Sequence, residues 1–149
     1  MSLYFTYRIS KQGCFMAIRY LHDTPLDVGQ VIALYQRTSL GKRRPVDRPD
    51  VFEGMIRNAN LVITAWDEDK LVGIARALTD FVYVTYLADL AVDEDYQHQG
   101  IGRHLLDQVQ GHTEPDCMVV LLAAPQANDY YPKLGFTHNP RAWMLKSNY

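Results

Sequence analysis

The sequence has few cysteines, and no stretch of it stays apolar for long. Its 149 residues include only Cys14 and Cys117, which lack CxxC spacing, so neither a disulfide framework nor a zinc site is indicated. This cysteine use fits a reducing compartment, and we expect a cytoplasmic protein. No apolar run approaches the ~18–20 residues that cross a bilayer. Residues 1–15 lack the apolar core of a signal peptide.

A strong excess of one charge is also lacking. The chain carries 15 Lys and Arg against 17 Asp and Glu, a formal net charge of −2. This balance gives no long-range attraction to nucleic acid or to anionic membranes, so we expect neither as a partner. Any bound anion must therefore be held by a local arrangement of groups. With 48% hydrophobic and 21% charged residues, the composition is that of an ordinary globular domain.

Hydrophobic periodicity predicts one mixed α+β domain over residues 16–149. A first strand at 17–21 precedes a helix that starts at Thr24-Pro25 and stops at Gly41, and a second helix follows near 51–58. Three apolar runs on short polar turns then predict an antiparallel meander. These runs are LVITAW (61–66), LVGIARAL (71–78) and FVYVTYLADLAV (81–92).

The C-terminal half alternates helix and strand. Residues 100–110 have a helical apolar period, and MVVLLAA (118–124) is apolar throughout, as in a strand at the centre of a sheet. A short helix at 127–133 and a last strand at 141–145 complete the order β-α-α-β-β-β-α-β-α-β. This order predicts α/β/α layers.

Residues 1–15 stand outside this pattern as an N-terminal extension of uncertain status. They are an added leader, an over-long start, or an extra edge strand, and the sequence leaves the three open.

The most informative stretch leads from the third run of the meander into the next helix. Gly100 and Gly102 stand where that helix begins, although glycine costs ~1 kcal/mol relative to alanine inside a helix. Without a Cβ, backbone amides at the helix start can contact a bulky anion such as a pyrophosphate, and Arg103 could complete the site. The alternative is that both glycines only make a tight turn. Gln97 completes a Gln-x-x-Gly-x-Gly pattern, which is neither a dinucleotide fingerprint nor a P-loop.

This segment, VDEDYQHQGIGRHLL (92–106), resembles the coenzyme-A-binding segment of the GCN5-related N-acetyltransferase (GNAT) superfamily, whose signature is Gln/Arg-x-x-Gly-x-Gly/Ala. Tyr130-Tyr131-Pro-Lys-Leu-Gly-Phe136 resembles the second signature of that superfamily, and the similarity covers residues 16–145. The resemblance implies a GNAT fold, with a central, mostly antiparallel sheet splayed at a cofactor cleft. It also implies an N-acetyltransferase that uses acetyl-CoA as cosubstrate and needs no metal.

The resemblance further implies how acetyl-CoA is held. Backbone groups of Leu90, Ala91 and Val92 would pair with the pantetheine arm as though it were another strand. The pyrophosphate would be bound across the loop and helix start, by Gln97, His98, Gln99, Gly100, Ile101, Gly102 and Arg103. One departure is that many members carry Asn where this chain has Ala124, so that contact is missing or supplied elsewhere, for example by Asn128.

Tyr131 matches the tyrosine that lies near the thioester sulfur and acts as general acid toward the leaving thiolate, with Tyr130 as the alternative. Phenol and thiol pKa values of ~10 and ~8.5 make this proton transfer reasonable. The expected reaction is direct attack of a neutral primary amine in a ternary complex, with an amide near Val92 stabilising the negative charge.

Asp89, on the strand expected to line the cofactor, is the candidate general base. Its alternative is a salt-bridged or solvated carboxylate. Asp93 and Glu94, in the following loop, are expected to be surface charges.

The acceptor side is the least determined. The connection between the first two helices is rich in cations, which would suit a carboxylate-bearing acceptor, bind the 3′-phosphate of coenzyme A, or simply face solvent; they are Lys42, Arg43, Arg44 and Arg48. A small-molecule amine and a protein amino group both remain open as acceptors, and the strand at 141–145 could support a homodimer. Rival functions are a non-catalytic acyl-CoA-binding sensor and a nucleotide-binding domain.

Overall fold

Six strands form one sheet in the computed structural model, which describes residues 4–9 and 15–146. The strands are β1 (Tyr4–Ile9), β2 (Phe15–His22), β3 (Leu61–Asp67), β4 (Lys70–Thr79), β5 (Val84–Val92) and β6 (Met118–Val120). They lie side by side in the order of the chain. Neighbouring strands are antiparallel from β1 to β5, and β6 runs parallel to β5.

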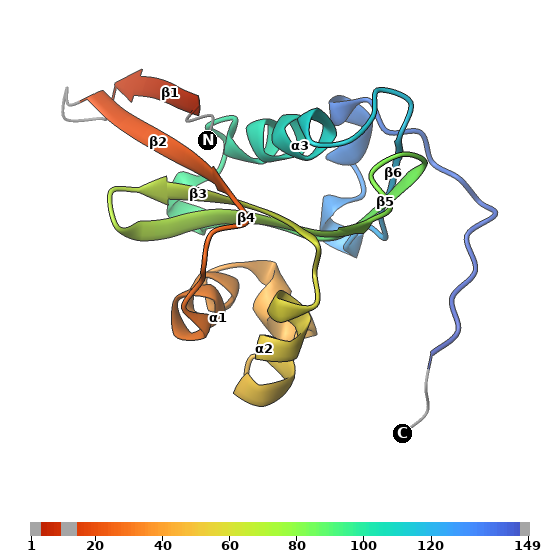
Figure 1. Cartoon of the computed structure of the whole chain (residues 1–149), viewed down its shortest axis with the longest axis horizontal. Coiled ribbons are helices and arrows are strands. Elements are labelled where there is room, and N and C mark those ends of the chain that lie inside the picture. The colour runs from red at the N-terminus through yellow and green to blue at the C-terminus, as the bar shows by residue number, and fades with distance from the viewer. Residues whose placement is uncertain (1–3, 10–14, 147–149) are drawn as a thin grey trace.

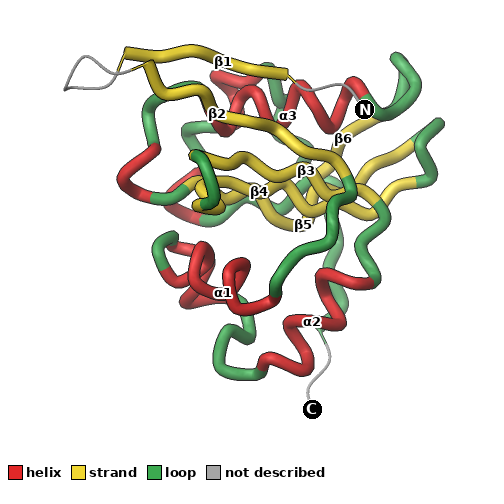
Figure 2. The backbone as a smooth tube through the Cα atoms, turned by 60° about the vertical axis from the view of Figure 1, so that its left-hand side comes forward, coloured by secondary structure: helices red, strands yellow, loops and turns green. Residues whose placement is uncertain are grey.

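Three α-helices cover the two faces of this sheet. They are α1 (Val28–Gln36), α2 (Pro49–Arg57) and α3 (Ile101–Gly111). Figures 1 and 2 show α3 on one face and α1 with α2 on the other. The predicted α+β fold with α/β/α layers is confirmed. Short 3₁₀ turns complete the chain as η1 (Ser39–Arg43), η2 (Glu94–Tyr96), η3 (Pro125–Ala127) and η4 (Tyr131–Leu134).

Each face of the sheet has its own core, because alternate strand residues point to opposite sides. The first core lies under α3, whose Ile101, Leu105 and Val109 are buried as the helical period predicted. The second lies under α1 and α2, where the Tyr35 and Phe52 rings meet edge to face at a centroid distance of 4.9 Å.

The meander of three strands is confirmed, but its third strand begins at Val84 and not at Phe81. The Asp80 carboxylate accepts hydrogen bonds from the amides of Val82, Tyr83 and Val84, which folds residues 81–83 into the turn. These backbone hydrogen bonds also hold the pKa of Asp80 below its usual value. A short polar side chain has therefore lengthened the turn at the expense of the strand.

The predicted limits of the first helix are wrong. Helix α1 begins at Val28 because Asp27, not Thr24, caps it: the Asp27 Oδ1 accepts from the Gln30 amide at 2.8 Å. The helix ends at Gln36, before Gly41. A Cβ at Gly41 would lie 2.7 Å from the Tyr35 carbonyl oxygen, so this glycine allows η1 to pack closely on α1.

Two further predictions fail after α3. MVVLLAA (118–124) is not a central strand, since β6 has only three residues and ends the sheet, with Met118 49% exposed. Residues 141–145 form no strand, and 127–133 forms only 3₁₀ turns. The physical reason is that the pairing of β6 with β5 ends at Val120. Beyond it the chain has no neighbouring strand in the described structure with which to form backbone hydrogen bonds.

At the other end of the sheet, β1 pairs with β2 from Tyr4↔Tyr20 to Ile9↔Phe15. This strand agrees with the edge-strand alternative for the N-terminal extension. The remainder of residues 1–14, with Cys14, lies outside the described residues, and the domain limits 16–149 stay a prediction. Among the helices of the described chain, none is long and apolar enough to span a membrane.

Leu105 of α3, which is fully buried in the first core, tests this packing. We expect Leu105→Ala to lower the free energy of unfolding by about 2–5 kcal/mol, because the deleted atoms leave a cavity. Urea denaturation followed by circular dichroism measures the change. Gln110→Ala, on the exposed side of the same helix, should change stability by less than ~0.5 kcal/mol. Equal effects of the two variants would contradict the described core.

Candidate active site

Strands β5 and β6 are paired for only three residues and then separate. The pairs are Val84↔Met118, Thr85↔Val119 and Tyr86↔Val120, whereas β5 continues to Val92 with β4 on its other side. Among the described strands, none lies against the outer edge of residues 87–92. This edge therefore offers backbone donors and acceptors to an extended ligand. It contains Leu90, Ala91 and Val92, the residues expected to pair with a pantetheine arm.

A β-bulge marks the point where the edge opens. The register of β4 and β5 shifts so that Arg76 faces Asp89 while Ala77 faces Leu87, which leaves Ala88 without a partner on β4. The guanidinium of Arg44 donates to the Ala88 carbonyl at 2.9 Å. Bulges re-aim the backbone next to binding sites. Here the bulge turns the following residues of β5 along the open edge.

The open edge leads into the start of α3. Gly100 has φ 82° and His98 has φ 58°, so left-handed residues alternate through the turn. A Cβ added to Gly100 would meet no atom within 4 Å. The amides of residues 98–103 donate to no acceptor in the described part of the chain, and α3 has no side-chain cap. Such a run of unpaired amides at a helix start is an anion-binding arrangement.

The polar side chains around this turn are engaged locally. Gln97 Nε2 donates to the Val92 carbonyl at 3.1 Å, Gln99 Nε2 donates to the Asp95 carbonyl at 3.4 Å, and Arg103 Nε donates to Asp107 at 3.1 Å. His98 is exposed. These side chains shape the turn, so the groups left for an anion are mainly backbone amides.

Gly102 has a different environment from Gly100. A Cβ at Gly102 would lie 2.6 Å from the Tyr130 hydroxyl oxygen and 3.7 Å from Val92 Cγ2. The close approach of Tyr130 is thus one reason for a glycine here, and sequence reasoning did not foresee it. The predicted open turn is found at Gly100. At Gly102 the missing side chain instead allows Tyr130, from the second signature, to pack against the first.

The two neighbouring tyrosines face different surroundings. Their rings lie 5.5 Å apart, and Tyr131 also stacks edge to face on Phe136 at 5.4 Å. Burial raises the pKa of both phenols, and the Tyr130 ring adds to the effect on Tyr131. The opposing charge is Arg103 for Tyr130 but Arg43 for Tyr131. Tyr130 lies against Gly102 at the helix start, and the cation that acts on Tyr131 is Arg43 of η1.

Asp89 is buried among its partners. Its Oδ2 accepts from the Tyr35 hydroxyl at 2.7 Å and from Arg76 Nε at 2.6 Å, and its Oδ1 accepts from Arg44 Nε at 2.7 Å. Burial, followed by the charge of Asp89, raises the pKa of Tyr35 well above its usual value, so this phenol stays a donor. The placement is that of the salt-bridged alternative, because both carboxylate oxygens are already paired.

Asp93 corrects another prediction, since it is 1% exposed and not a surface charge. It pairs with Arg37 at 2.6 Å and with Lys70 at 3.2 Å. Burial alone would raise the pKa of Asp93, but the Asp95 amide, Arg37 and Lys70 outweigh burial and lower it. The sequence signal that was missed is the position of Asp93 as the N-cap of η2. Its Oδ1 accepts a hydrogen bond from the Asp95 amide. Glu94 is exposed, as expected.

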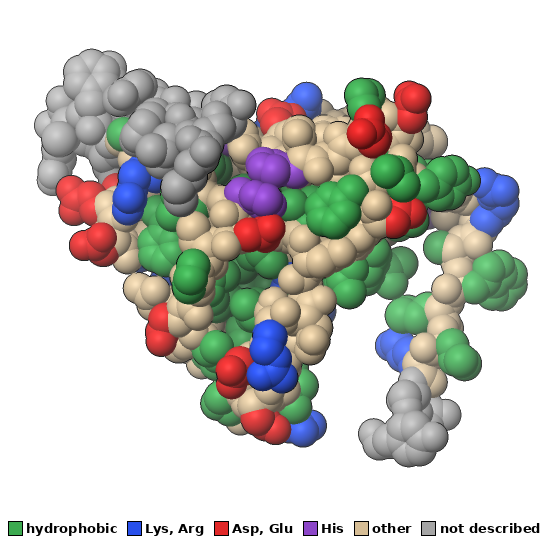
Figure 3. Space-filling view, viewed as in Figure 1, with side chains coloured by type: hydrophobic (Ala, Val, Ile, Leu, Met, Phe, Trp, Pro, Cys, Tyr) green, Lys and Arg blue, Asp and Glu red, His purple; other side chains and the backbone are tan. Residues whose placement is uncertain are grey.

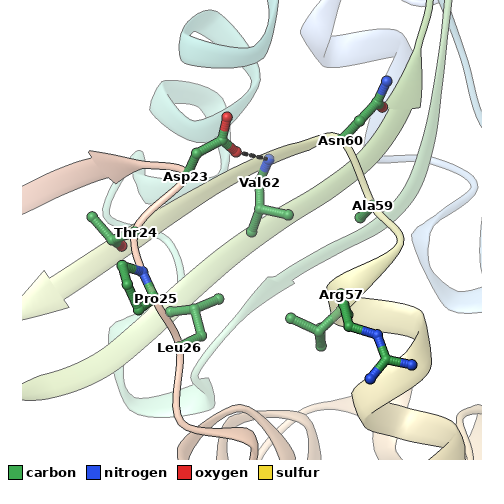
Figure 4. Close-up of a pocket in the computed structure, with 9 residues that line it drawn as sticks. Asp23, Thr24, Pro25, Leu26, Arg57, Ala59, Asn60 and Val62 are labelled. Carbon is green, nitrogen blue, oxygen red and sulfur yellow. Dashed lines mark hydrogen bonds between the residues drawn. The ribbon is translucent and has the colours of Figure 1, made fainter.

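A separate cavity of about 380 Å3 lies on the α1–α2 face of the sheet. Figure 4 shows that it is lined by the loop after β2, from Asp23 to Leu26, and by the segment between α2 and β3. Asn60 in this lining bonds to Thr79, at the opposite end of the sheet from Gly100. None of the residues predicted to bind acetyl-CoA reaches this cavity.

The splayed sheet and the amide-lined helix start define the GNAT class of fold. A family described as "Acetyltransferase (GNAT) domain" matches residues 35–142. The chain therefore belongs to the GNAT family of acetyltransferases.

Individual relatives and structures agree with this family. The chain is 37% identical over 75 residues to GCN5-related N-acetyltransferase 2, chloroplastic, of Arabidopsis thaliana; the match covers 49% of this chain but only 29% of that protein. A GNAT-family acetyltransferase structure from Streptococcus pneumoniae has a TM-score of 0.69 at 22% identity, covering 87% of this chain and 99% of the other. Aminoglycoside N-acetyltransferase AAC(6′)-Iy in complex with CoA has a TM-score of 0.68 at 16% identity, covering 88% and 95%.

The buried Asp89 cluster provides a test of the role of this carboxylate. We expect Asp89→Asn to lower the free energy of unfolding by about 3–5 kcal/mol, because Arg44 and Arg76 would lose the partner of their partly buried charges. Chemical denaturation at neutral pH measures the loss. Asp107→Asn breaks the exposed pair with Arg103 and should cost less than ~1 kcal/mol. An Asp89→Asn protein as stable as the unaltered one would show that the cluster is not structural.

Proposed function

We propose that this protein transfers an acetyl group from acetyl-CoA to a primary amine by direct attack in a ternary complex. The observation that carries the proposal is the continuity of two features: an unpaired strand edge over residues 87–92, and unpaired amides at the start of α3. An extended pantetheine arm suits the first feature, and a pyrophosphate suits the second. The CoA complex of AAC(6′)-Iy, which shares the fold, is consistent with this pairing.

Backbone groups of Leu90, Ala91 and Val92 would hold the pantetheine arm. The pyrophosphate would lie at Gly100, where a side chain is absent and the turn is open. Its further contacts would come from the neighbouring residues of the chain, namely Gln97, His98, Gln99, Ile101, Gly102 and Arg103. When bound, acetyl-CoA supplies the activated acetyl thioester. The remaining task of the protein is to align an amine, stabilise charge near the Val92 amide, and provide a proton.

Tyr131 is the proton donor of the proposal. Its raised pKa keeps the phenol protonated at neutral pH, so it can donate to the departing sulfur. The nitrogen of the attacking amine gives up its proton to water, and Tyr131 regains a proton from water, so the products are the acetylated amine and free thiol. The charge of Arg43, on η1 at the expected acceptor side, acts on Tyr131, which supports a place for this phenol beside the acceptor. Tyr130 lies over Gly102 instead, which favours a part in shaping the pyrophosphate turn.

For Asp89 we propose positioning in place of the predicted base role. To accept a proton, this carboxylate would have to give up hydrogen bonds from Arg44, Arg76 or Tyr35. The Asp89 carboxylate instead orients the Arg44 side chain, which also donates a hydrogen bond to the carbonyl of Ala88 in the bulge. The cluster thereby sets the direction of the open edge.

The acceptor is proposed to be a small-molecule amine or a protein amino group. Lys42 and Arg43 are exposed on η1, and Arg43 is near enough to Tyr131 to oppose the rise of its pKa. These cations favour an acceptor that carries a carboxylate over a polycation such as the aminoglycosides named for AAC(6′)-Iy. The cytoplasm is the proposed compartment, because the low cysteine content of the sequence fits a reducing environment.

The pyrophosphate turn is tested by Gly100→Ala. Because φ at Gly100 is 82°, a Cβ strains the turn and enters the space assigned to the anion, so the dissociation constant of coenzyme A should rise ~10-fold or more. Isothermal titration calorimetry measures it. Gly54→Ala in α2, where a Cβ also meets nothing within 4 Å, should leave coenzyme A affinity unchanged. Equal affinities of both variants for coenzyme A would place the pyrophosphate elsewhere.

The transfer reaction is tested by Tyr131→Phe. Loss of the proton donor should lower kcat by ~10²-fold or more while acetyl-CoA binding persists. Free thiol release from acetyl-CoA, measured over a panel of amines with and without carboxylates, gives the rate. The matched control is Tyr83→Phe, at a 69% exposed tyrosine. If the unaltered protein binds acetyl-CoA but no amine of the panel causes thiol release, the transferase proposal fails and the acyl-CoA-binding sensor is favoured.

A further inference from the structure

The turn to which the pyrophosphate is assigned has few anchors on the rest of the fold. Its two glutamines donate only to carbonyls of the segment 92–95, which leads into the turn. Among the described residues from 95 to 100, Tyr96 alone makes a side-chain hydrogen bond to another part of the molecule. The position of the turn relative to the sheet is therefore set largely through Tyr96, the last residue of η2.

Tyr96 is held by the end of the β3–β4 hairpin. Its hydroxyl donates to Asp67 Oδ2 at 2.6 Å, and its ring packs against the core under α3. Burial, followed by the hydrogen bond to Asp67, raises the pKa of Tyr96 to about 12. Because this value lies far above neutral pH, the phenol stays protonated and remains a donor to Asp67.

Lys70 provides a second contact between the same hairpin and η2. The strand register places Lys70 opposite Asp67. Its Nζ lies 4.8 Å from the centroid of the Tyr96 ring and 3.2 Å from Oδ2 of the buried Asp93. Since Asp93 is the N-cap of η2, the hairpin end contacts this 3₁₀ turn at its cap and at its last residue.

The hairpin end is itself fixed to the sheet, because Arg19 of β2 donates to the Glu68 carbonyl at 2.5 Å. Figure 3 shows acidic side chains at the left edge of the molecule, where Figure 1 places the β3–β4 turn. Glu68 and Asp69 of this turn are exposed, whereas Asp67 is half-buried. Of these three carboxylates, Asp67 is the one that bonds to η2.

We propose that Tyr96 and Asp67 are positioning residues for acetyl-CoA, which hold the turn before α3 in the conformation that binds the diphosphate. The inference rests on the proposed function, since it assigns a role within the same site. Both residues act at the diphosphate end of that site, because Tyr96 directly precedes the turn. They therefore affect the affinity for the diphosphate part of the cofactor and not the rate of acetyl transfer.

Calorimetric titration with coenzyme A and with pantetheine, which has no phosphate, tests this role. Tyr96→Phe keeps the ring and loses the hydrogen bond, so it should raise the dissociation constant of coenzyme A ~5–10-fold and leave that of pantetheine unchanged. At saturating acetyl-CoA, kcat should stay within ~2-fold of the unaltered protein. Tyr83→Phe, at a 69% exposed tyrosine, is the matched control and should change neither dissociation constant.

Substitutions of Asp67 separate positioning from a general loss of packing. Asp67→Ala should behave as Tyr96→Phe does. Asp67→Asn retains an acceptor oxygen for the phenol and should restore the coenzyme A affinity. The inference would be overturned by an unaltered coenzyme A affinity of Tyr96→Phe, by equal losses for coenzyme A and pantetheine, by a loss that falls on kcat, or by an Asp67→Asn protein as impaired as Asp67→Ala.

The same titrations distinguish failure of this inference from failure of the proposed function. An unaltered protein that binds coenzyme A no more tightly than pantetheine has no diphosphate site at Gly100, and the proposed function fails together with the inference. If the unaltered protein prefers coenzyme A and Tyr96→Phe prefers it equally, only the positioning role is wrong.

Discussion

The site depends on one constraint: β5 has a strand on both sides for three residues and on one side for the rest of its length. Backbone N–H and C=O groups need partners wherever they are shielded from water. An edge opened inside a folded domain is therefore a place where a ligand can complete the sheet. In this chain the open edge runs directly into a helix start with unpaired amides. We propose that the edge binds the pantetheine arm of acetyl-CoA and that the helix start binds its pyrophosphate.

Two buried carboxylates, in β5 and directly after it, tie that strand to the α1–η1 region. Asp89 is bound by Arg44 from the segment after α1, and Asp93 by Arg37 at the end of α1. Both ties link the α1–η1 region, where the acceptor is expected, to the residues that flank the open edge. Removing a charge partner from such buried pairs is costly, so the geometry is stiff. The proposed acceptor side and the proposed cofactor side are thus tied to each other through these two ion pairs.

Local sequence signals predicted what depends on neighbours in the chain. The meander, α3 and the turn at Gly100 follow from apolar period and from glycine at a helix start, and the structure confirms each. Predictions failed where distant residues decide. The partners of Asp89, from Tyr35 to Arg76, come from three separate elements, so no spacing could reveal them. Similarly, the apolar run at 118–124 looked central because its pattern does not show that β5 turns away from it.

Backbone amide NMR during titration with coenzyme A tests the central claim most directly. The account predicts that the largest shift changes fall on Leu90 to Val92 and on residues 97–103, with little change around the cavity near Asn60. Saturable changes confined to that cavity, or no change at millimolar coenzyme A, would contradict it.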